Sequence, residues 1–63
     1  MTQNYSWTEV GEDPGCEVLA RSKYGEFLVG YLENIQGVWE CTDDHQLLDA
    51  VTHYIKIKDL WIG

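Results

Sequence analysis

The stretch from Gly25 to Thr42, GEFLVGYLENIQGVWECT, decides the fold of this chain. Successive side chains of a strand point to opposite faces. In residues 26–33 this alternation places aromatic and aliphatic side chains in a row on one face. A turn over residues 34–37 ends in glycine, and residues 38–42 return as a second strand. The stretch therefore predicts a β-hairpin on which the rest of the chain packs. The side chains expected to share a face are Phe27, Val29 and Tyr31 on the first strand, and Trp39 and Cys41 on the second.

Three further segments have the same period of two. Residues 5–10 predict a strand with an aromatic face that can meet the hairpin. Residues 16–21 predict another strand, with Val18 and Ala20 directed inward. Residues 51–58 form the clearest half-buried pattern, with Tyr54 on the outer face, and their lysines indicate an exposed edge of the sheet.

The segment of residues 43–50 breaks this period. An aspartate there can cap a helical turn, with Leu47 and Leu48 turned inward. We therefore predict a single, mainly β domain over residues 1–63, a small antiparallel meander of about five strands with one short helical turn before the last strand. Such a sheet can curl toward a partly open barrel. The apolar tail at residues 59–63 either covers the open end of the sheet or binds a partner.

The composition is that of a small folded protein. Of its 63 residues, 44% are hydrophobic, which is too apolar for a disordered chain. No apolar run approaches the ~20 residues that a membrane span needs, and the polar start lacks the features of a signal peptide. We therefore expect a soluble, cytoplasmic protein with no membrane partner. Cys16 and Cys41 could form a disulfide, but in a reducing cytoplasm we expect two buried free thiols.

The charge of the chain is strongly negative. Eleven acidic residues face four basic ones, for a formal net charge of −7. Nucleic acids and anionic lipids attract Lys and Arg, so this charge disfavours direct binding to either. A charged partner is expected to be basic, and the alternative is that the acidity only confers solubility.

The chain has no pattern typical of a catalytic or metal site. Cys41, His45 and His53, with Cys16, are residue types that bind zinc, but their spacing lacks the paired knuckles of a zinc site. Acidic surroundings work against a reactive thiolate, and the adjacent aspartates do not match a calcium loop. A chain this short can scarcely enclose a substrate cleft. We therefore expect a protein that is not an enzyme and has no cofactor or metal.

Several short motifs follow one another along the chain: Trp7, Pro14-Gly15, residues 17–20, Gly25, Val38-Trp39 and residues 51–54. In this order they resemble a small domain-of-unknown-function family of tailed phages and prophages. In that family a Trp and a Pro-containing loop precede a Val-Leu-Val strand, and a Thr-His-Trp segment with prolines closes the domain. This chain has Tyr54 in place of the closing Trp, and residues 56–58 in place of the proline-rich ending. The resemblance implies a small β domain of phage or prophage origin and brings no catalytic residue.

The resemblance also implies a function, because small acidic phage proteins often bind a host enzyme or defence complex. We expect a non-enzymatic inhibitor or modulator that binds a host protein with a basic surface, such as a host-defence or nucleic-acid-binding protein. The alternative is a structural or assembly protein that forms homo-oligomers through the edge strand and the apolar tail. The expected partner-binding residues are an acidic face of Glu33, Glu40, Asp43, Asp44 and Asp49, with Tyr24 and Trp61 as exposed aromatic anchors.

Overall fold

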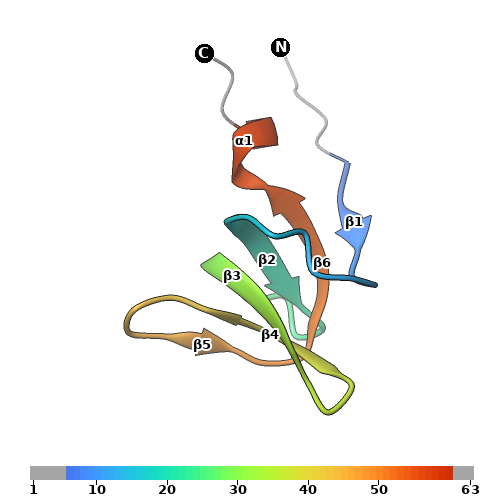
Figure 1. Cartoon of the computed structure of the whole chain (residues 1–63), viewed down its shortest axis with the longest axis vertical. Helices are drawn as coiled ribbons and strands as arrows, with labels where there is room; N and C mark the ends of the chain where they lie inside the picture. Colours follow the sequence, from blue (N-terminus) through green and yellow to red (C-terminus); the bar gives the residue numbers. More distant parts are fainter. Residues whose placement is uncertain (1–5, 61–63) are drawn as a thin grey trace.

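The structure is a computed structural model that describes residues 6–60 of the chain. The described part forms one antiparallel sheet of six strands, in the order β1-β6-β2-β3-β4-β5 (Figure 1). The predicted small, mainly β antiparallel fold is confirmed: β2 to β5 follow one another as a meander, and β6 returns to pair with β2. The elements are β1 Thr8–Glu9, β2 Val18–Ser22, β3 Phe27–Ile35, β4 Val38–Thr42, β5 Leu47–Leu48, β6 Val51–Lys56 and α1 Ile57–Leu60.

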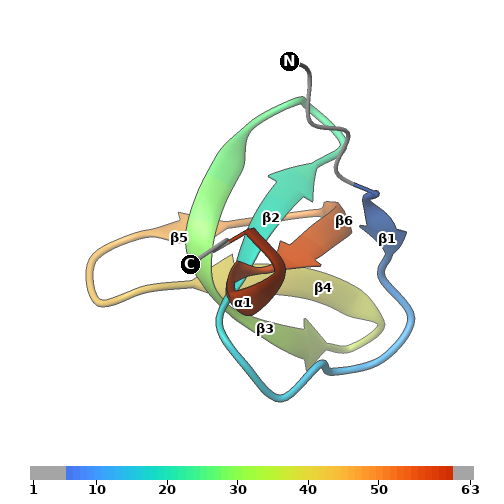
Figure 2. The ribbon, with the colours of Figure 1, turned by 90° about the horizontal axis from the view of Figure 1, so that it is seen from above.

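The long strand β3 joins the two halves of the sheet. Its residues 27–30 pair with β2, whereas residues 31–35 pair with β4. At this junction the two strands come very close together. A Cβ atom on Gly30 would lie 2.7 Å from the carbonyl carbon of Thr42 and would overlap that carbonyl group. Only glycine allows this close approach of two strands. The sheet consequently curls around the core instead of lying flat (Figure 2).

The turn between β3 and β4 is short and tightly specified. Ile35 pairs with Val38, so only Gln36 and Gly37 form the loop, and both have positive φ, 53° and 87°. This is the pattern of a type I′ turn, whose twist matches that of the flanking strands. The Asn34 Oδ1 atom accepts a hydrogen bond of 2.9 Å from the Gly37 N–H. The predicted hairpin is present, with its first strand extending two residues further than expected.

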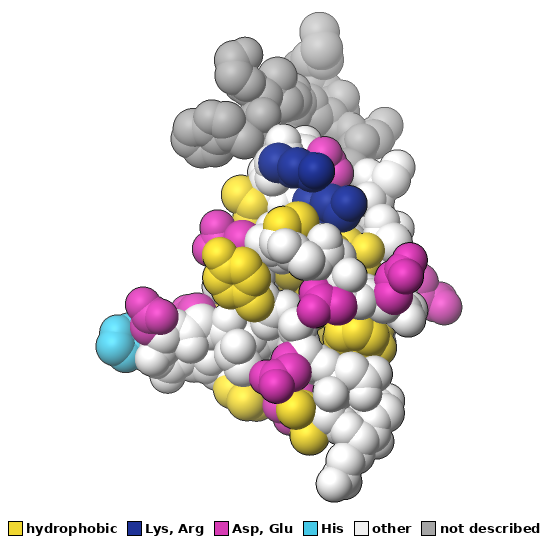
Figure 3. Space-filling view, in the orientation of Figure 1, with side chains coloured by type: hydrophobic (Ala, Val, Ile, Leu, Met, Phe, Trp, Pro, Cys, Tyr) yellow, Lys and Arg dark blue, Asp and Glu magenta, His cyan; other side chains and the backbone are white. Residues whose placement is uncertain are grey.

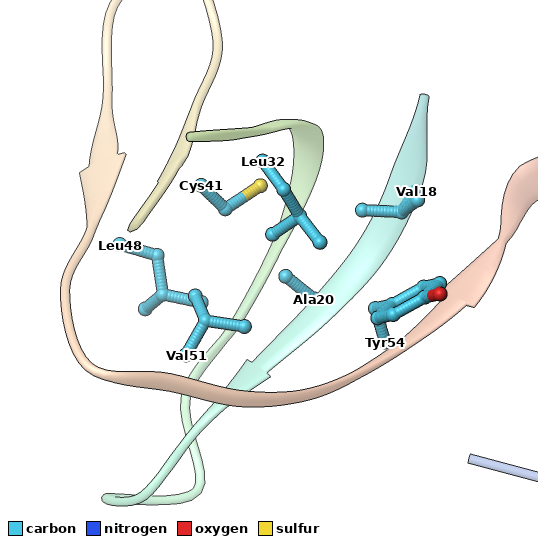
Figure 4. Close-up of a cluster of buried hydrophobic side chains, with 7 residues drawn as sticks. All are labelled: Val18, Ala20, Leu32, Cys41, Leu48, Val51 and Tyr54. Atoms are coloured by element: carbon cyan, nitrogen blue, oxygen red, sulfur yellow. The ribbon is translucent and has the colours of Figure 1, made fainter. Parts of the chain in front are cut away.

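The hydrophobic core lies on the inner face of the curled sheet (Figure 4). Val18, Ala20 and Cys41 are completely buried, so the predicted inward face of β2 is confirmed. Trp39 packs against this core from β4, on the same face as Cys41. The core side chains are Val18, Ala20, Leu32, Cys41, Leu48, Val51 and Tyr54.

The even-numbered residues at the start of β3 face the core, and the odd-numbered residues between them lie on the exposed outer face. Leu28 packs against the core and Gly30 and Leu32 are buried, whereas Phe27, Val29 and Tyr31 point outward and are 56%, 43% and 58% exposed. Of the segment 5–10 expected to be a strand, only Thr8–Glu9 is one, and Tyr5 lies outside the described residues. Trp7 does meet the hairpin, as expected for the aromatic face. The rings of Trp7 and Phe27 lie 5.9 Å apart, centroid to centroid.

The prediction for the last strand is wrong in three respects. The strand ends at Lys56, because Ile57 and Lys58 begin α1. β6 lies between β1 and β2, so it is not a sheet edge; the edges are β1 and β5, each two residues long. The expected alternation of side chains is also interrupted, because Arg21 pairs with His53 but the next residue pairs with Val51. This irregularity leaves Thr52 as an extra residue, and it turns both Val51 and Tyr54 toward the core.

The helical turn is also misplaced in the prediction. Residues 43–50 form no helix; they contain β5, which pairs with β4 at Cys41 and Thr42. Leu48 is buried as expected, but Leu47 is 56% exposed because neighbouring strand residues face opposite ways. The helical turn is α1, after the last strand. No helix in residues 6–60 is both long and apolar enough to cross a membrane.

The close approach at Gly30 gives a direct test of the fold. We expect Gly30→Ala to lower the free energy of unfolding by roughly 1–3 kcal/mol, because the new methyl group forces the two strands apart. Urea denaturation followed by tryptophan fluorescence measures this change. Gly11→Ala is the matched control, since a Cβ there meets nothing within 4 Å, and its stability is expected to change by less than about 0.5 kcal/mol. Equal stability of the two variants would contradict the constraint at Gly30.

Candidate interaction surface

The outer face of the β3–β4 hairpin combines exposed apolar side chains with two carboxylates. The strand register places Glu33 directly opposite Glu40 in the middle of this face. Apolar side chains lie on both sides of the glutamates, because Tyr31 precedes them and the Ile35–Val38 pair follows. We call this surface the hairpin face; it consists of Tyr31, Glu33, Ile35, Val38, Glu40 and Thr42.

The part of the chain that contains the two glutamates of the hairpin face has no Lys or Arg side chain to neutralise them. Residues 27–50, which contain β3, β4 and β5, include five acidic residues and no Lys or Arg. Like charges directly opposite each other on neighbouring strands destabilise a sheet. The glutamate pair is therefore a local cost to the fold, and a positive charge from outside would relieve it.

A polar hollow of about 480 Å³ adjoins one end of the hairpin face. Tyr31 and Thr42 belong to both, so the hollow and the face form a continuous surface. The carboxylates at the hollow extend the negative charge of the hairpin face. The lining residues are Glu17, Gly30, Tyr31, Thr42, Asp43, Asp44 and His45.

The Asp43 carboxylate has a structural role at this hollow. Its Oδ1 atom accepts hydrogen bonds from the backbone N–H groups of His45, at 2.7 Å, and Gln46, at 2.6 Å. These two hydrogen bonds hold the pKa of Asp43 below its usual range. Asp43 therefore closes the loop between β4 and β5, while Asp44 is exposed beside it.

The residues expected to bind a partner divide into several groups. Glu33 and Glu40 lie together on the hairpin face, and Asp43 and Asp44 line the adjoining hollow. The others do not belong to this surface. Tyr24 is 69% exposed in the turn after β2, Asp49 lies in the turn after β5, and Trp61 is outside the described residues. Figure 3 shows acidic side chains at several separate places, including the β4–β5 loop.

The turns that hold Tyr24 and Asp49 are neighbours in space. The Lys23 N–H donates a hydrogen bond of 3.0 Å to the carbonyl oxygen of Ala50. The Lys23 Nζ atom lies 5.1 Å from the centroid of the Tyr24 ring. This region therefore contains a cation, unlike the hairpin face, and is less suited to a basic partner.

Sequence reasoning missed the apolar part of the hairpin face, namely Tyr31, Ile35 and Val38. A signal was present, because Tyr31, Glu33 and Ile35 are alternate residues of one strand and therefore share a face. A carboxylate in that row indicates that the row faces water. Glu17, which lines the hollow, had no comparable signal, since it comes from a segment remote in sequence.

The other end of the outer face is covered and carries a positive charge. The Arg21 guanidinium carbon lies 5.2 Å from the centroid of the Trp7 ring, and Trp7 in turn contacts Phe27. An Arg21 nitrogen lies 3.5 Å from Nδ1 of His53. The Trp7–Arg21 contact fastens the segment before β1 onto the sheet. The open, cation-free part of the outer face is therefore the hairpin face.

The residues considered for zinc binding are not brought together. Cys41 points into the core and its Sγ atom contacts the Leu28 carbonyl oxygen at 3.6 Å, while His45 is exposed on a loop. His53 is held beside Arg21 and Thr52. Within residues 6–60, no group of three or more His, Cys, Asp or Glu side chains could hold a metal ion.

Both cysteines are free thiols, but they differ in environment. Cys16 is half-buried and Cys41 is fully buried, so the prediction of two buried thiols holds only for Cys41. Burial, with a smaller contribution from the negative charge of Asp43, raises the pKa of the Cys41 thiol to about 11. Cys41 is therefore a core side chain and is protonated at neutral pH.

Comparison with known proteins found no matching family model and no significantly similar curated protein or solved structure.

The glutamate pair predicts a variant that is more stable than the original chain. We expect Glu33→Gln to raise the free energy of unfolding by roughly 0.2–1 kcal/mol, because it removes the repulsion from Glu40. The gain should shrink as salt is added, since Glu33 is exposed and Glu40 only half-buried, and salt screens charges that reach solvent. Urea denaturation at low and high salt measures both effects. Glu12→Gln, in the exposed loop before β2, is the control and should change stability less; an equal or larger gain there would show that only net charge matters.

The buried thiol of Cys41 predicts a loss of stability in alkali. The unfolded chain releases this proton near pH 9, whereas the folded chain retains it until about pH 11. The folded state therefore binds more protons in this interval, and the free energy of unfolding falls as the pH rises through it. Denaturation at pH 8, 9, 10 and 11 measures the slope. Cys41→Ser, whose hydroxyl does not ionise there, should show a shallower slope, and identical slopes would contradict the assignment.

Proposed function

We propose that this chain is a non-enzymatic protein of phage or prophage type that binds a basic surface of a host protein and thereby inhibits or modulates it. The observation that carries the proposal is the hairpin face, where exposed apolar side chains lie on both sides of two glutamates and residues 27–50 contain no Lys or Arg. Apolar area supplies binding energy, while carboxylates select a positively charged partner and speed its association. A face with both properties is suited to binding a protein.

The resemblance to the phage family directs the proposal toward a bacterial host cytoplasm. Proteins that bind nucleic acid present clustered Lys and Arg, which an acidic protein can occupy in place of the phosphate backbone. Host-defence and nucleic-acid-binding proteins are therefore the proposed class of target. The chain itself, with its net charge of −7, is unsuited to binding nucleic acid directly.

Solubility alone does not account for the placement of the acidic residues. Negative charge keeps a protein soluble wherever it lies on the surface. Placing Glu33 opposite Glu40 adds an electrostatic cost without adding solubility. The arrangement is better explained if a cationic partner binds there.

Self-association receives less support than binding to a different protein. β6 is not an edge strand, so the expected route through residues 51–58 is wrong. Of the apolar tail, the other part of that route, residues 61–63 lie outside the described residues. The hairpin face is apolar enough to pack against a second copy, but a two-fold contact would bring four glutamates together. That repulsion disfavours a homodimer through this face.

Affinity capture from a bacterial lysate tests the proposal with three forms of the protein. The original chain and the control Glu12→Gln/Glu26→Gln should retain the same host protein at a stoichiometric level. Glu33→Gln/Glu40→Gln should lose it, although both variants remove two negative charges. High salt should weaken capture by the original chain and by the control. Asp43 is left unchanged because its carboxylate closes a loop.

Two results would contradict the proposal. Equal capture by all three forms would show that the hairpin face does not bind the partner. Recovery of the bait alone, together with a mass that rises with concentration in light scattering, would favour a structural, self-associating protein.

A further inference from the structure

The hairpin face presents side chains, because the backbone N–H and carbonyl groups of its two strands point sideways, within the plane of the sheet. Residues 31–35 and 38–42 pair with each other across the hairpin, and their backbone hydrogen bonds lie in the plane of the sheet. A partner segment lying on this face therefore finds no N–H or carbonyl groups to pair with. Since backbone groups need hydrogen bonds when they are buried, such a segment must satisfy its own. An α-helix does so, whereas a single extended strand does not.

The spacing of the hairpin face also fits a helix. Its three cross-strand pairs follow at steps of two residues, which places them roughly 6.8 Å apart along the strands. Helix positions i and i+4 are about 6 Å apart along the helix axis and lie on one side of it. A helix along β3 can thus place one side chain over Tyr31, the next over the glutamates, and a third over Ile35 and Val38.

The chemistry of the three steps specifies the three side chains. The first and third positions face exposed apolar groups, which are Tyr31 at one end and the Ile35–Val38 pair at the other. The central position faces two carboxylates. An arginine suits this position better than a lysine, because its planar guanidinium has five N–H donors and can bind both carboxylates at once.

We propose that the partner of the hairpin face is an amphipathic α-helix with an arginine at position i+4 between apolar side chains at i and i+7 or i+8. The arginine lies between Glu33 and Glu40, and the apolar side chains pack on Tyr31 and on the Ile35–Val38 pair. This inference rests on the proposed function, because it specifies the shape and chemistry of the basic partner.

A synthetic peptide provides the probe. It is an alanine- and glutamine-based helix with leucine at i and i+7 and arginine at i+4, and its matched control has glutamine in place of arginine. Calorimetric titration should show that the arginine peptide binds roughly tenfold more tightly than the glutamine peptide. A third peptide with a central proline, which breaks the helix, should bind much more weakly than the arginine peptide.

The variants of the protein locate the contact. The preference for arginine over glutamine should disappear in Glu33→Gln/Glu40→Gln and remain in Glu12→Gln/Glu26→Gln. A preference that persists in both variants would overturn the proposed position of the arginine. Equal binding of the proline peptide would overturn the helical shape. The proposed arginine contact would also be overturned if the arginine and glutamine peptides bound the original chain equally, or if neither bound it.

The two proposals can fail separately. If lysate capture depends on Glu33 and Glu40 but the helical probe does not bind, the partner is basic but does not present such a helix. If the probe binds at the glutamates but no host protein is captured through them, the hairpin face accepts this helix and the proposed host partner is wrong.

Discussion

The close approach of two strands at Gly30 is the constraint on which the rest of the structure depends. Because no side chain separates β3 from the Thr42 carbonyl, β3 can leave β2 and join β4 within one residue. This junction brings Cys41 to the Leu28 carbonyl oxygen and gives the sheet its curl. A curled sheet can enclose a core on its inner face even in a chain of 63 residues. The outer face of β3 is left open by the same geometry.

The sequence was sufficient to predict the hairpin, the inward face of β2 and the antiparallel class, since these depend on local periodicity and on a short glycine turn. It failed at Thr52 and at Leu47. At Thr52 the irregular pairing between β2 and β6 reverses the alternation of side chains. This irregularity depends on how β6 pairs with β2, so it could not be predicted from residues 51–58 alone. At Leu47 the aspartate that was expected to cap a helix instead closes a hairpin loop, because the same carboxylate can accept N–H groups in either conformation.

The candidate site was predictable only in part for a related reason. Charge clusters can be read from the sequence, and Glu33 and Glu40 were found in this way. Whether two carboxylates lie face to face depends on strand register, which the two-residue turn at Gln36 and Gly37 determines. The apolar residues beside them were assigned to strands, but which face of the sheet they occupy could not be predicted. The hairpin face was therefore recognised only once the core had been located. A small domain has little stability to spare, and exposed apolar side chains beside paired negative charges are therefore informative about function.

The position of β6 between β1 and β2 has a consequence for biosynthesis. Arg21 and His53 meet although they lie 32 positions apart in the sequence, so the centre of the sheet cannot form until the last strand has been synthesised. The β2–β3–β4 meander can pair earlier, because its contacts are local. During translation the nascent meander therefore exposes one open edge of β2 and the future core. The acidic residues of the hairpin would limit aggregation of this intermediate, since like-charged chains repel each other. The negative charges of the hairpin would thus protect the chain before it has folded.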